Sequence, residues 1–222
     1  MKLNKYIDHT LLKAIATKSD IIQLCNEAKE NDFFSVCVNS SYVALAKKEL
    51  QSSSVKVCSV IGFPLGAMST QAKVAETKQA LLDGADEIDM VMNIGALKSK
   101  DFEFLSKDIE AVKNAMPNNT LKVILETCYL EESEIIKASI LAIKAGADFI
   151  KTSTGFGTGG ASIKDVELMK SVLGDSKVKI KASGGIRDTS TALAYINIGV
   201  ERIGTSNGIA IVTGGNSKEN NY

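Results

Sequence analysis

Tryptophan is absent from this 222-residue chain, and proline occurs only twice. That composition argues against a linker-rich or disordered chain. Basic and acidic residues balance at 26 each, and neither sign forms a long block. The sequence therefore lacks the electrostatic footprint of a nucleic-acid-binding module or of a surface that binds acidic membranes, and we expect neither partner.

Paired cysteines and long apolar runs are also missing. The four cysteines are widely spaced and form no Cys-x-x-Cys pair, which argues against a zinc site or a redox motif. Three of them lie in apolar stretches, where a thiol packs as a small hydrophobic group. No run of 18 apolar residues occurs, and the first residues contain no apolar signal segment. We therefore expect a reducing, cytoplasmic location. The cysteines are Cys25, Cys37, Cys58 and Cys128.

The chain does contain short apolar runs that alternate with amphipathic stretches. Hydrophobic residues make up 45% of the sequence, enough for a sizeable core. Phe102, Leu105 and Ile109 fall on one face of a predicted helix, and Gly84 stands where a left-handed residue ends another. The apolar runs predict eight strands, at residues 6–11, 34–38, 56–61, 87–92, 122–126, 149–152, 179–181 and 202–205.

A similar six-residue pattern occurs at three of the predicted helix-to-strand junctions. The fifth residue of each repeat is isoleucine, and the sixth is Asp89, Lys151 or Gly204. Side chains of a strand alternate between its two faces. If the isoleucines face the helices, Asp89 and Lys151 point inward and Gly204 opens space beside them. The repeats cover residues 84–89, 146–151 and 199–204.

Eight strands alternating with helices in about 220 residues predict a single-domain α/β protein, a closed (β/α)₈ barrel. We assign the barrel to residues 1–213 and expect residues 214–222 to be a mobile polar tail. An open doubly wound sheet is the alternative, but it more naturally carries a Gly-x-Gly-x-x-Gly turn after its first strand, and none follows here. Barrel active sites lie at the carboxyl ends of the strands. Lys151, Lys181 and Asp89 should therefore converge at one mouth.

Lys151 and Lys181 lie inside segments that otherwise read as buried strands. An unpartnered buried ammonium costs several kcal/mol, so these charges favour a role in chemistry. A lysine attacks a carbonyl only when neutral, although its reference pKa is about 10.4, and both desolvation and a neighbouring cation disfavour the protonated form. Asp89 can hold one lysine protonated and pass protons through water. The set predicts Schiff-base chemistry, with a structural Lys–Asp–Lys network as the alternative.

Other polar residues have supporting or structural interpretations. Lys179 shares the parity of Lys181 but lies earlier in its strand, which favours the bottom rim of the barrel. Glu126 either supports the site or is an edge residue. We expect His9, the only histidine, to be structural. Residues that could support the site from behind are Asp8, Thr10, Cys37 and Thr152, with simple packing as the alternative for Cys37.

Glycine-rich segments follow the last three predicted strands. Backbone N–H groups exposed at glycine turns bind phosphate, and the loops after strands seven and eight hold one in many barrels. Plain turn glycines are the alternative. The loop at residues 153–160 either borders the same site or moves as a flap. The candidate phosphate-binding residues are Gly155, Gly184, Gly185, Gly204, Thr205 and Ser206.

Four motifs together resemble the 2-deoxyribose-5-phosphate aldolase family. They are Lys-Thr-Ser-Thr-Gly-Phe-Gly from Lys151, Lys-Ala-Ser-Gly-Gly-Ile-Arg from Lys181, Gly-Ala-Asp-Glu-Ile-Asp-Met-Val from Gly84 and Ile-Asp-His-Thr-Leu-Leu-Lys from Ile7. The resemblance extends over nearly the whole chain. It implies a class I aldolase without metal or cofactor that reversibly cleaves 2-deoxy-D-ribose 5-phosphate to acetaldehyde and D-glyceraldehyde 3-phosphate, in deoxynucleoside breakdown.

The resemblance also implies roles for individual residues. Lys151 would form the Schiff base, Lys181 would be the second lysine that disfavours protonation of the first, and Asp89 would be the partner acid and base. Thr205 stands where a small residue is usual. Phe156 occupies a position that is lysine in some members, so a side-chain phosphate contact is absent there.

Two other functions are alternatives. One is a phosphosugar isomerase or epimerase on the same barrel, and the other is a phosphosugar-binding protein without turnover. Barrels of this kind commonly form homodimers or homotetramers, and we expect one of these without a predicted interface. The terminal Tyr222 either folds over the mouth to help proton transfer or belongs to a disordered end.

Overall fold

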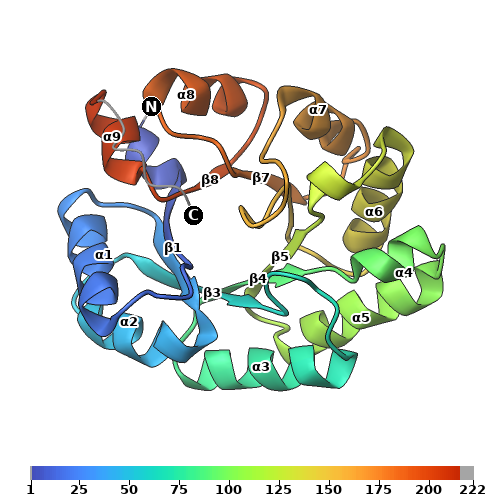
Figure 1. Ribbon diagram of the computed structural model, residues 1–222, viewed down its shortest axis with the longest axis horizontal. Helices are drawn as coiled ribbons and strands as arrows, with labels where there is room; N and C mark the ends of the chain where they lie inside the picture. Colours follow the sequence, from blue (N-terminus) through green and yellow to red (C-terminus); the bar gives the residue numbers. More distant parts are fainter. Residues whose placement is uncertain (1, 216–222) are drawn as a thin grey trace.

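The computed structural model describes residues 2–215 and shows a closed ring of parallel strands inside a ring of helices (Figure 1). The strands follow each other in sequence order, and the last pairs with the first. The predicted (β/α)₈ barrel is confirmed. The strands are β1 (Ile7–Leu11), β2 (Ser35–Asn39), β3 (Lys56–Ile61), β4 (Glu87–Val91), β5 (Thr120–Ile124), β6 (Phe149–Lys151), β7 (Lys179–Ser183) and β8 (Arg202–Thr205).

Helices cover the outside of the ring and connect successive strands (Figure 1). Thr17 and Ser69 accept backbone N–H groups at two helix starts and so satisfy donors that lack partners there. Within residues 2–215, no helix is both long and apolar enough to cross a bilayer. The α-helices are α1 (Lys18–Glu30), α2 (Val43–Glu49), α3 (Thr70–Leu82), α4 (Ile94–Lys98), α5 (Phe102–Ala115), α6 (Glu132–Lys144), α7 (Ile163–Ser171), α8 (Thr189–Asn197) and α9 (Gly208–Thr213); short 3₁₀ turns are η1 (Leu3–Tyr6), η2 (Ser40–Tyr42) and η3 (Thr127–Tyr129).

The strand bounds of β3 and β8 match the prediction, and the others differ by one or two residues at one or both ends. The largest correction concerns β5, which was predicted at residues 122–126. It begins at Thr120 and ends at Ile124, and Glu126 adopts a left-handed φ of 57° that ends the extended chain. Lys122 consequently lies in the middle of the strand.

The predicted alternation of faces sets the division between core and site. Ile88, Ile150 and Ile203 are fully buried in the main core between strands and helices. Each such side chain contributes about 1.5–3 kcal/mol through burial. Residues of opposite parity fill the inside of the ring, and many of these are charged.

Candidate active site

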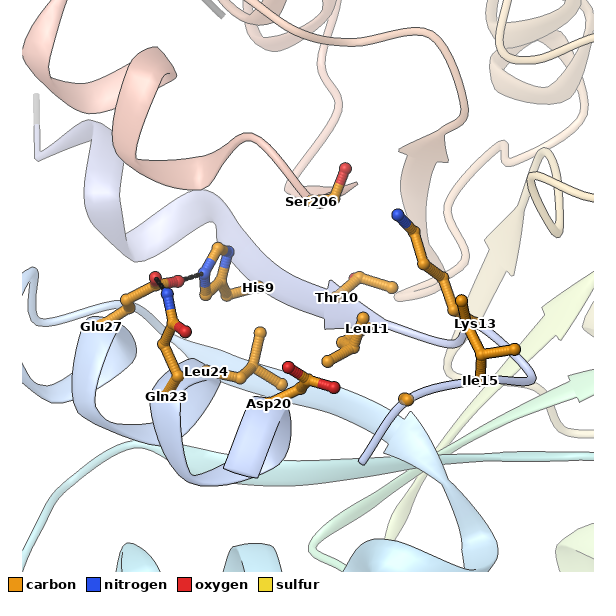
Figure 2. Close-up of a pocket in the computed structure, with 11 residues that line it drawn as sticks. His9, Thr10, Leu11, Lys13, Ile15, Asp20, Gln23, Leu24, Glu27 and Ser206 are labelled. Carbon is orange, nitrogen blue, oxygen red and sulfur yellow. Dashed lines mark hydrogen bonds and ion pairs between the residues drawn. The ribbon is translucent and has the colours of Figure 1, made fainter. Parts of the chain in front are cut away.

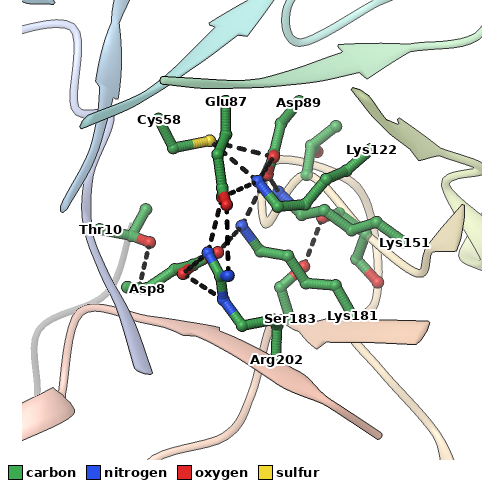
Figure 3. A network of polar contacts seen from close by, with 12 residues as sticks. Asp8, Thr10, Cys58, Glu87, Asp89, Lys122, Lys151, Lys181, Ser183 and Arg202 are labelled. Carbon is green, nitrogen blue, oxygen red and sulfur yellow. Dashed lines mark hydrogen bonds and ion pairs between the residues drawn. The ribbon is translucent and has the colours of Figure 1, made fainter. Parts of the chain in front are cut away.

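Asp89, in the middle of β4, is the centre of a buried ionic cluster inside the barrel (Figure 3). Lys151 Nζ, from the end of β6, and Lys181 Nζ, from β7, each donate to Asp89 Oδ2 at 2.7 Å. Lys122 Nζ, from β5, donates to Asp89 Oδ1 at 2.8 Å. None of the four side chains is more than 3% exposed. The structure therefore brings together the three residues expected at one mouth and adds Lys122.

A second set of charged groups, Asp8, Glu87 and Arg202, lies next to these residues (Figure 3). Lys181 Nζ forms an ion pair with Asp8 Oδ2 at 2.5 Å, and Lys122 Nζ forms one with Glu87 Oε2 at 2.7 Å. Arg202 joins the two acids, because its Nε donates to Asp8 Oδ1 at 2.8 Å and its Nη2 to Glu87 Oε2 at 2.7 Å. Asp8, expected only as support, thus contacts Lys181 directly.

The surroundings fix the charge of most of the cluster. Burial alone would raise the pKa of Asp89, but Lys122, Lys151 and Lys181 outweigh it and hold that pKa well below its ordinary range. Burial would lower the pKa of Lys181, yet the carboxylates of Asp8 and Asp89 raise it above the ordinary value. The same balance, with Asp89 as the main anion, raises the pKa of Lys122. Lys122 and Lys181 are therefore held as ammonium groups beside Lys151.

The cluster contains more basic groups than acidic groups. Four bases face three acids, so the cluster carries one net positive charge when every base is protonated. A buried cluster is most stable when its charges cancel, which requires one base to lose its proton. Lys151 pairs with one carboxylate, that of Asp89, whereas Lys122 and Lys181 pair with two carboxylates each. The bases are Lys122, Lys151, Lys181 and Arg202, and the acids are Asp8, Glu87 and Asp89.

Sequence reasoning missed Lys122, Glu87 and Arg202. Lys122 shares the parity of Ile124 and Glu126, so alternation along the strand could have placed it inside the barrel. It was overlooked because the predicted strand began at this residue, where a lysine is usual at a rim. Glu87 and Arg202 likewise begin β4 and β8 but are 2% and 4% exposed.

Of the supporting residues, Thr10 and Thr152 bind main chain. Thr10 Oγ1 donates to the carbonyl oxygen of Asp8 at 2.8 Å. Thr152 Oγ1 donates to the carbonyl oxygen of Ser183 at 3.2 Å and accepts its N–H at 3.1 Å. Neither hydroxyl bonds to a lysine of residues 2–215, and both fix the main chain of the strands that carry the charged groups.

Cys37 lies beside Cys58 on the neighbouring strand, at paired positions of β2 and β3. Cys58 Sγ donates to Asp89 Oδ1 at 3.1 Å. The Sγ atoms of both cysteines and one Asp89 oxygen lie within 4.8 Å of one another, the one such set of potential metal donors among residues 2–215. Because Lys122 and its neighbours already supply cations to Asp89, the surroundings disfavour a metal cation. Cys37 is fully buried and packs with Leu12.

The glycines after β6 and β7 meet at the carboxyl end of the barrel. Gly184 and Gly185 have φ values of 83° and 81°, and Gly155 has one of 89°, all in the region that favours glycine. A Cβ atom on Gly160 would lie 2.3 Å from the carbonyl oxygen of Gly184. The two loops therefore pack main chain against main chain.

Gly204 in β8 packs closely against side chains of β7. A Cβ atom at this position would lie 3.1 Å from Cε of Lys181 and 3.0 Å from Cβ of Ser183. The missing side chain thus leaves space beside Lys181, whereas the repeat predicted space beside Asp89 and Lys151. Thr205 is buried, and its Oγ1 donates to the carbonyl oxygen of Ile186, in the loop after β7, at 2.8 Å and accepts the N–H of Asn207 at 2.9 Å.

A cavity of about 360 Å³ lies beside the end of β1, between β8 and α1 (Figure 2). Thr10, Lys13 and Ser206 line it together. Lys13 is half-buried, and its ammonium group forms no hydrogen bond or ion pair with the side chains or main chain of residues 2–215. On the far side of the cavity, His9 Nε2 bonds Glu27 Oε2 at 2.7 Å, which fits the expected structural role of His9.

Two ambiguous residues now have locations. Lys179 is exposed at the amino end of β7 and pairs with Glu201 at 2.7 Å, which confirms the bottom rim. Glu126 accepts the backbone N–H of Thr154 at 3.0 Å and also its hydroxyl, so it fixes the loop that follows β6. The predicted tail beyond residue 215, including Tyr222, lies outside the described residues.

Comparisons with known proteins agree on the class that this fold and site define, the barrel aldolases. The family profile of the DeoC/LacD family aldolases matches residues 2–211. The chain belongs to the DeoC/LacD aldolase family.

Similar proteins span the whole chain. The deoxyribose-phosphate aldolase of Finegoldia magna is 59% identical over 214 residues, covering 96% of this chain and 100% of that protein. That of Brevibacillus brevis is 55% identical over 222 residues, covering all of both. Among solved structures, a putative deoxyribose-phosphate aldolase from Coccidioides immitis has a TM-score of 0.94 at 46% identity, over 96% of this chain and 85% of that one. A tetrameric deoxyribose phosphate aldolase from Aeropyrum pernix has a TM-score of 0.88 at 32% identity, over 95% and 89%.

Proposed function

We propose that this chain is a class I aldolase that reversibly cleaves 2-deoxy-D-ribose 5-phosphate to acetaldehyde and D-glyceraldehyde 3-phosphate through a Schiff base on Lys151. The observation that carries the proposal is the unequal pairing of the buried lysines. Lys151 shares one carboxylate with Lys181, while Lys181 has a second carboxylate of its own. The names of the curated relatives support the substrate.

The reaction begins at the substrate aldehyde. The neutral amine of Lys151 attacks the open-chain C1 carbonyl, and the resulting carbinolamine loses water to form an iminium ion. Asp89 and protonated Lys181 lie within 2.7 Å of each other beside this nitrogen and can exchange the required protons. The iminium ion then accepts electrons from the bond between C2 and C3.

Cleavage and release use the same groups. A water held by Asp89 and Lys181 removes the proton of the 3-hydroxyl, the C2–C3 bond breaks, and C3 leaves as the aldehyde of glyceraldehyde 3-phosphate. The electron pair remains on the enamine. Protonation at C2 and hydrolysis then release acetaldehyde and restore the amine of Lys151.

The substrate phosphate is proposed to bind at the turns after β6, β7 and β8. Backbone N–H groups at the positive-φ glycines after β6 and β7 suit an anion. Lys13 is proposed to add the side-chain cation that Phe156 does not provide, since Lys13 shares a cavity with Ser206 and Phe156 instead packs against Phe63. The proposed phosphate-binding residues are Gly155, Gly184, Gly185, Gly204, Thr205 and Ser206.

A coupled assay for glyceraldehyde 3-phosphate tests the function. Lys151→Ala should abolish turnover, and borohydride should trap acetaldehyde on Lys151 of the intact protein, as seen by peptide mass spectrometry. Lys179→Ala is the matched control because that lysine is exposed at the opposite end of the barrel. Phosphosugar binding without cleavage or a trapped adduct would instead support the non-catalytic barrel, and isomerisation without an adduct would support an isomerase.

Assembly and location are proposed with the function. We infer a homodimer or homotetramer, supported by the tetrameric relative from Aeropyrum pernix, and sedimentation of the purified chain tests it. A cytoplasmic location is supported by the four free cysteines and is tested by fractionation.

A further inference from the structure

We propose that Arg202 is a positioning residue that keeps Lys151 in its neutral, nucleophilic form by supplying the fourth positive charge to a cluster with only three acids. The inference rests on the proposed function for its consequence in catalysis. Its physical basis is the placement of one permanent cation at the bottom of the same buried network.

Arg202 is 4% exposed, and its guanidinium forms ion pairs with both Asp8 and Glu87. Its guanidinium contacts Asp8 and Glu87 and lies 3.4 Å from the centre of the Phe34 ring. Asp8 also forms an ion pair with Lys181, and Glu87 forms one with Lys122. Arg202 therefore influences both lysines that share Asp89 with Lys151, without touching Lys151.

Without Arg202, three acids would face three lysines. The cluster would then be neutral with every lysine protonated. Asp8 and Glu87, no longer paired with Arg202, would stabilise the lysine ammonium groups more strongly. With Arg202 present, neutrality requires one lysine to give up a proton. Because Lys151 has one carboxylate partner and the others have two, the proton lost is that of Lys151.

All strands contribute titratable or charged groups to this environment. Lysines and acids at the open lower end face solvent, where their charges are screened. The thiols count as neutral in this scheme. The groups that face the cluster are Asp8 from β1, Cys37 from β2, Cys58 from β3, Glu87 and Asp89 from β4, Lys122 from β5, Lys181 from β7 and Arg202 from β8; those at the lower end are Lys5, Lys56, Asp148, Lys177, Lys179 and Glu201.

Single and paired substitutions test the count of charges. Arg202→Met should move the acid limb of the pH profile of kcat/KM to higher pH by about one unit, roughly a tenfold loss of the reactive amine at a given pH. Glu87→Gln removes an acid and should move the limb to lower pH. Arg202→Met combined with Glu87→Gln again leaves one excess base, and its limb should return close to that of the native protein. Arg202→Lys should also stay close to native.

A second measurement reports the amine without requiring turnover. Trace acetic anhydride acylates neutral amines, so the pH dependence of Lys151 labelling relative to Lys179, followed by peptide mass spectrometry, should shift as the acid limb does. If Arg202→Met does not fold, the opposite shift of Glu87→Gln and its cancellation in the double variant still decide the matter. Shifts of the same sign for both single variants would overturn the proposal.

Two further outcomes separate the proposals. Labelling that shifts as expected in a protein without aldolase turnover would retain the role of Arg202 and reject the proposed function. Aldolase turnover together with a Lys151 labelling profile that Arg202→Met does not change would reject the role of Arg202 and leave the proposed function intact. A Cys37→Ser variant should leave the labelling profile unchanged, and a shift would show that a thiolate supplies a fourth negative charge, which overturns the count.

Discussion

Lys151 and Lys181 donate to the same oxygen atom, Oδ2 of Asp89, at 2.7 Å each. The register of the barrel produces this convergence, because the two lysines are paired positions on the adjacent strands β6 and β7. Two ammonium groups that share one acceptor repel each other at short range. Lys181 also pairs with Asp8, whereas Asp89 is the one carboxylate partner of Lys151 among residues 2–215.

Replacing Lys181 tests this division of roles. Lys181→Met removes both the cation beside Lys151 and a proton-transfer group, so kcat should fall by about 10²–10⁴. Borohydride should still trap acetaldehyde on Lys151, although more slowly, because the nucleophile itself is retained. Lys179→Met, two residues earlier on β7, should leave both measurements unchanged. Turnover within twofold of native for Lys181→Met would contradict the assignment.

The sequence predicted the barrel and the inward direction of the charges, because both follow from local patterns. Alternation along a strand decides which face a side chain occupies, and the repeat at Ile88, Ile150 and Ile203 made that face explicit. The packing of these isoleucines in the outer core confirms the reasoning.

The connections within the site could not be predicted in the same way. Which charges meet depends on the stagger between strands, and no single strand encodes it. Lys122 reaches Asp89 because these residues are paired positions of β5 and β4. Arg202 reaches Glu87 across the inside of the closed ring, from a strand far away in the sequence.

Lys13 provides a test of the phosphate end of the site. Lys13→Met should raise KM for 2-deoxyribose 5-phosphate by roughly 10-fold or more, because a hydrogen bond to a charged group contributes about 1.5–3 kcal/mol. Cleavage of 2-deoxyribose without phosphate should not change. Lys18→Met, an exposed lysine at the start of α1, is the control. An equal loss with both substrates would mean that Lys13 does not select the phosphate.

Acid should destabilise the fold through the carboxylates of the cluster. Burial opposes ionisation of Asp8, but Arg202 and Lys181 outweigh it, and the pKa of Asp8 is lowered like that of Asp89. An acid with a folded-state pKa below its unfolded value, near 3.9, stabilises the fold above that value and loses this contribution as pH falls. The free energy of unfolding from urea titrations should therefore fall progressively below about pH 5.

The matched variants separate this effect from general acid unfolding. Asp8→Asn should lower stability at pH 7 and weaken the dependence on pH, because one of the shifted acids is gone. Asp175→Asn alters an exposed acid and should leave both unchanged. A pH dependence that is identical in the native protein and in Asp8→Asn would argue against the contribution of this carboxylate.

A second buried ion pair, outside the site, predicts a purely structural effect. Lys73 Nζ on α3 contacts Asp108 Oδ2 on α5 at 2.6 Å, and both side chains are fully buried. Lys73→Met leaves the carboxylate without its cation and should lower the free energy of unfolding by about 3–5 kcal/mol. Lys73→Met combined with Asp108→Leu should recover most of the loss, because apolar groups of similar volume often replace a buried pair without cost. Lys107→Met removes the exposed partner of Glu103 and should have no measurable effect. Urea titration with and without the second substitution decides between an uncompensated charge and a simple loss of packing, since only the former is relieved by Asp108→Leu.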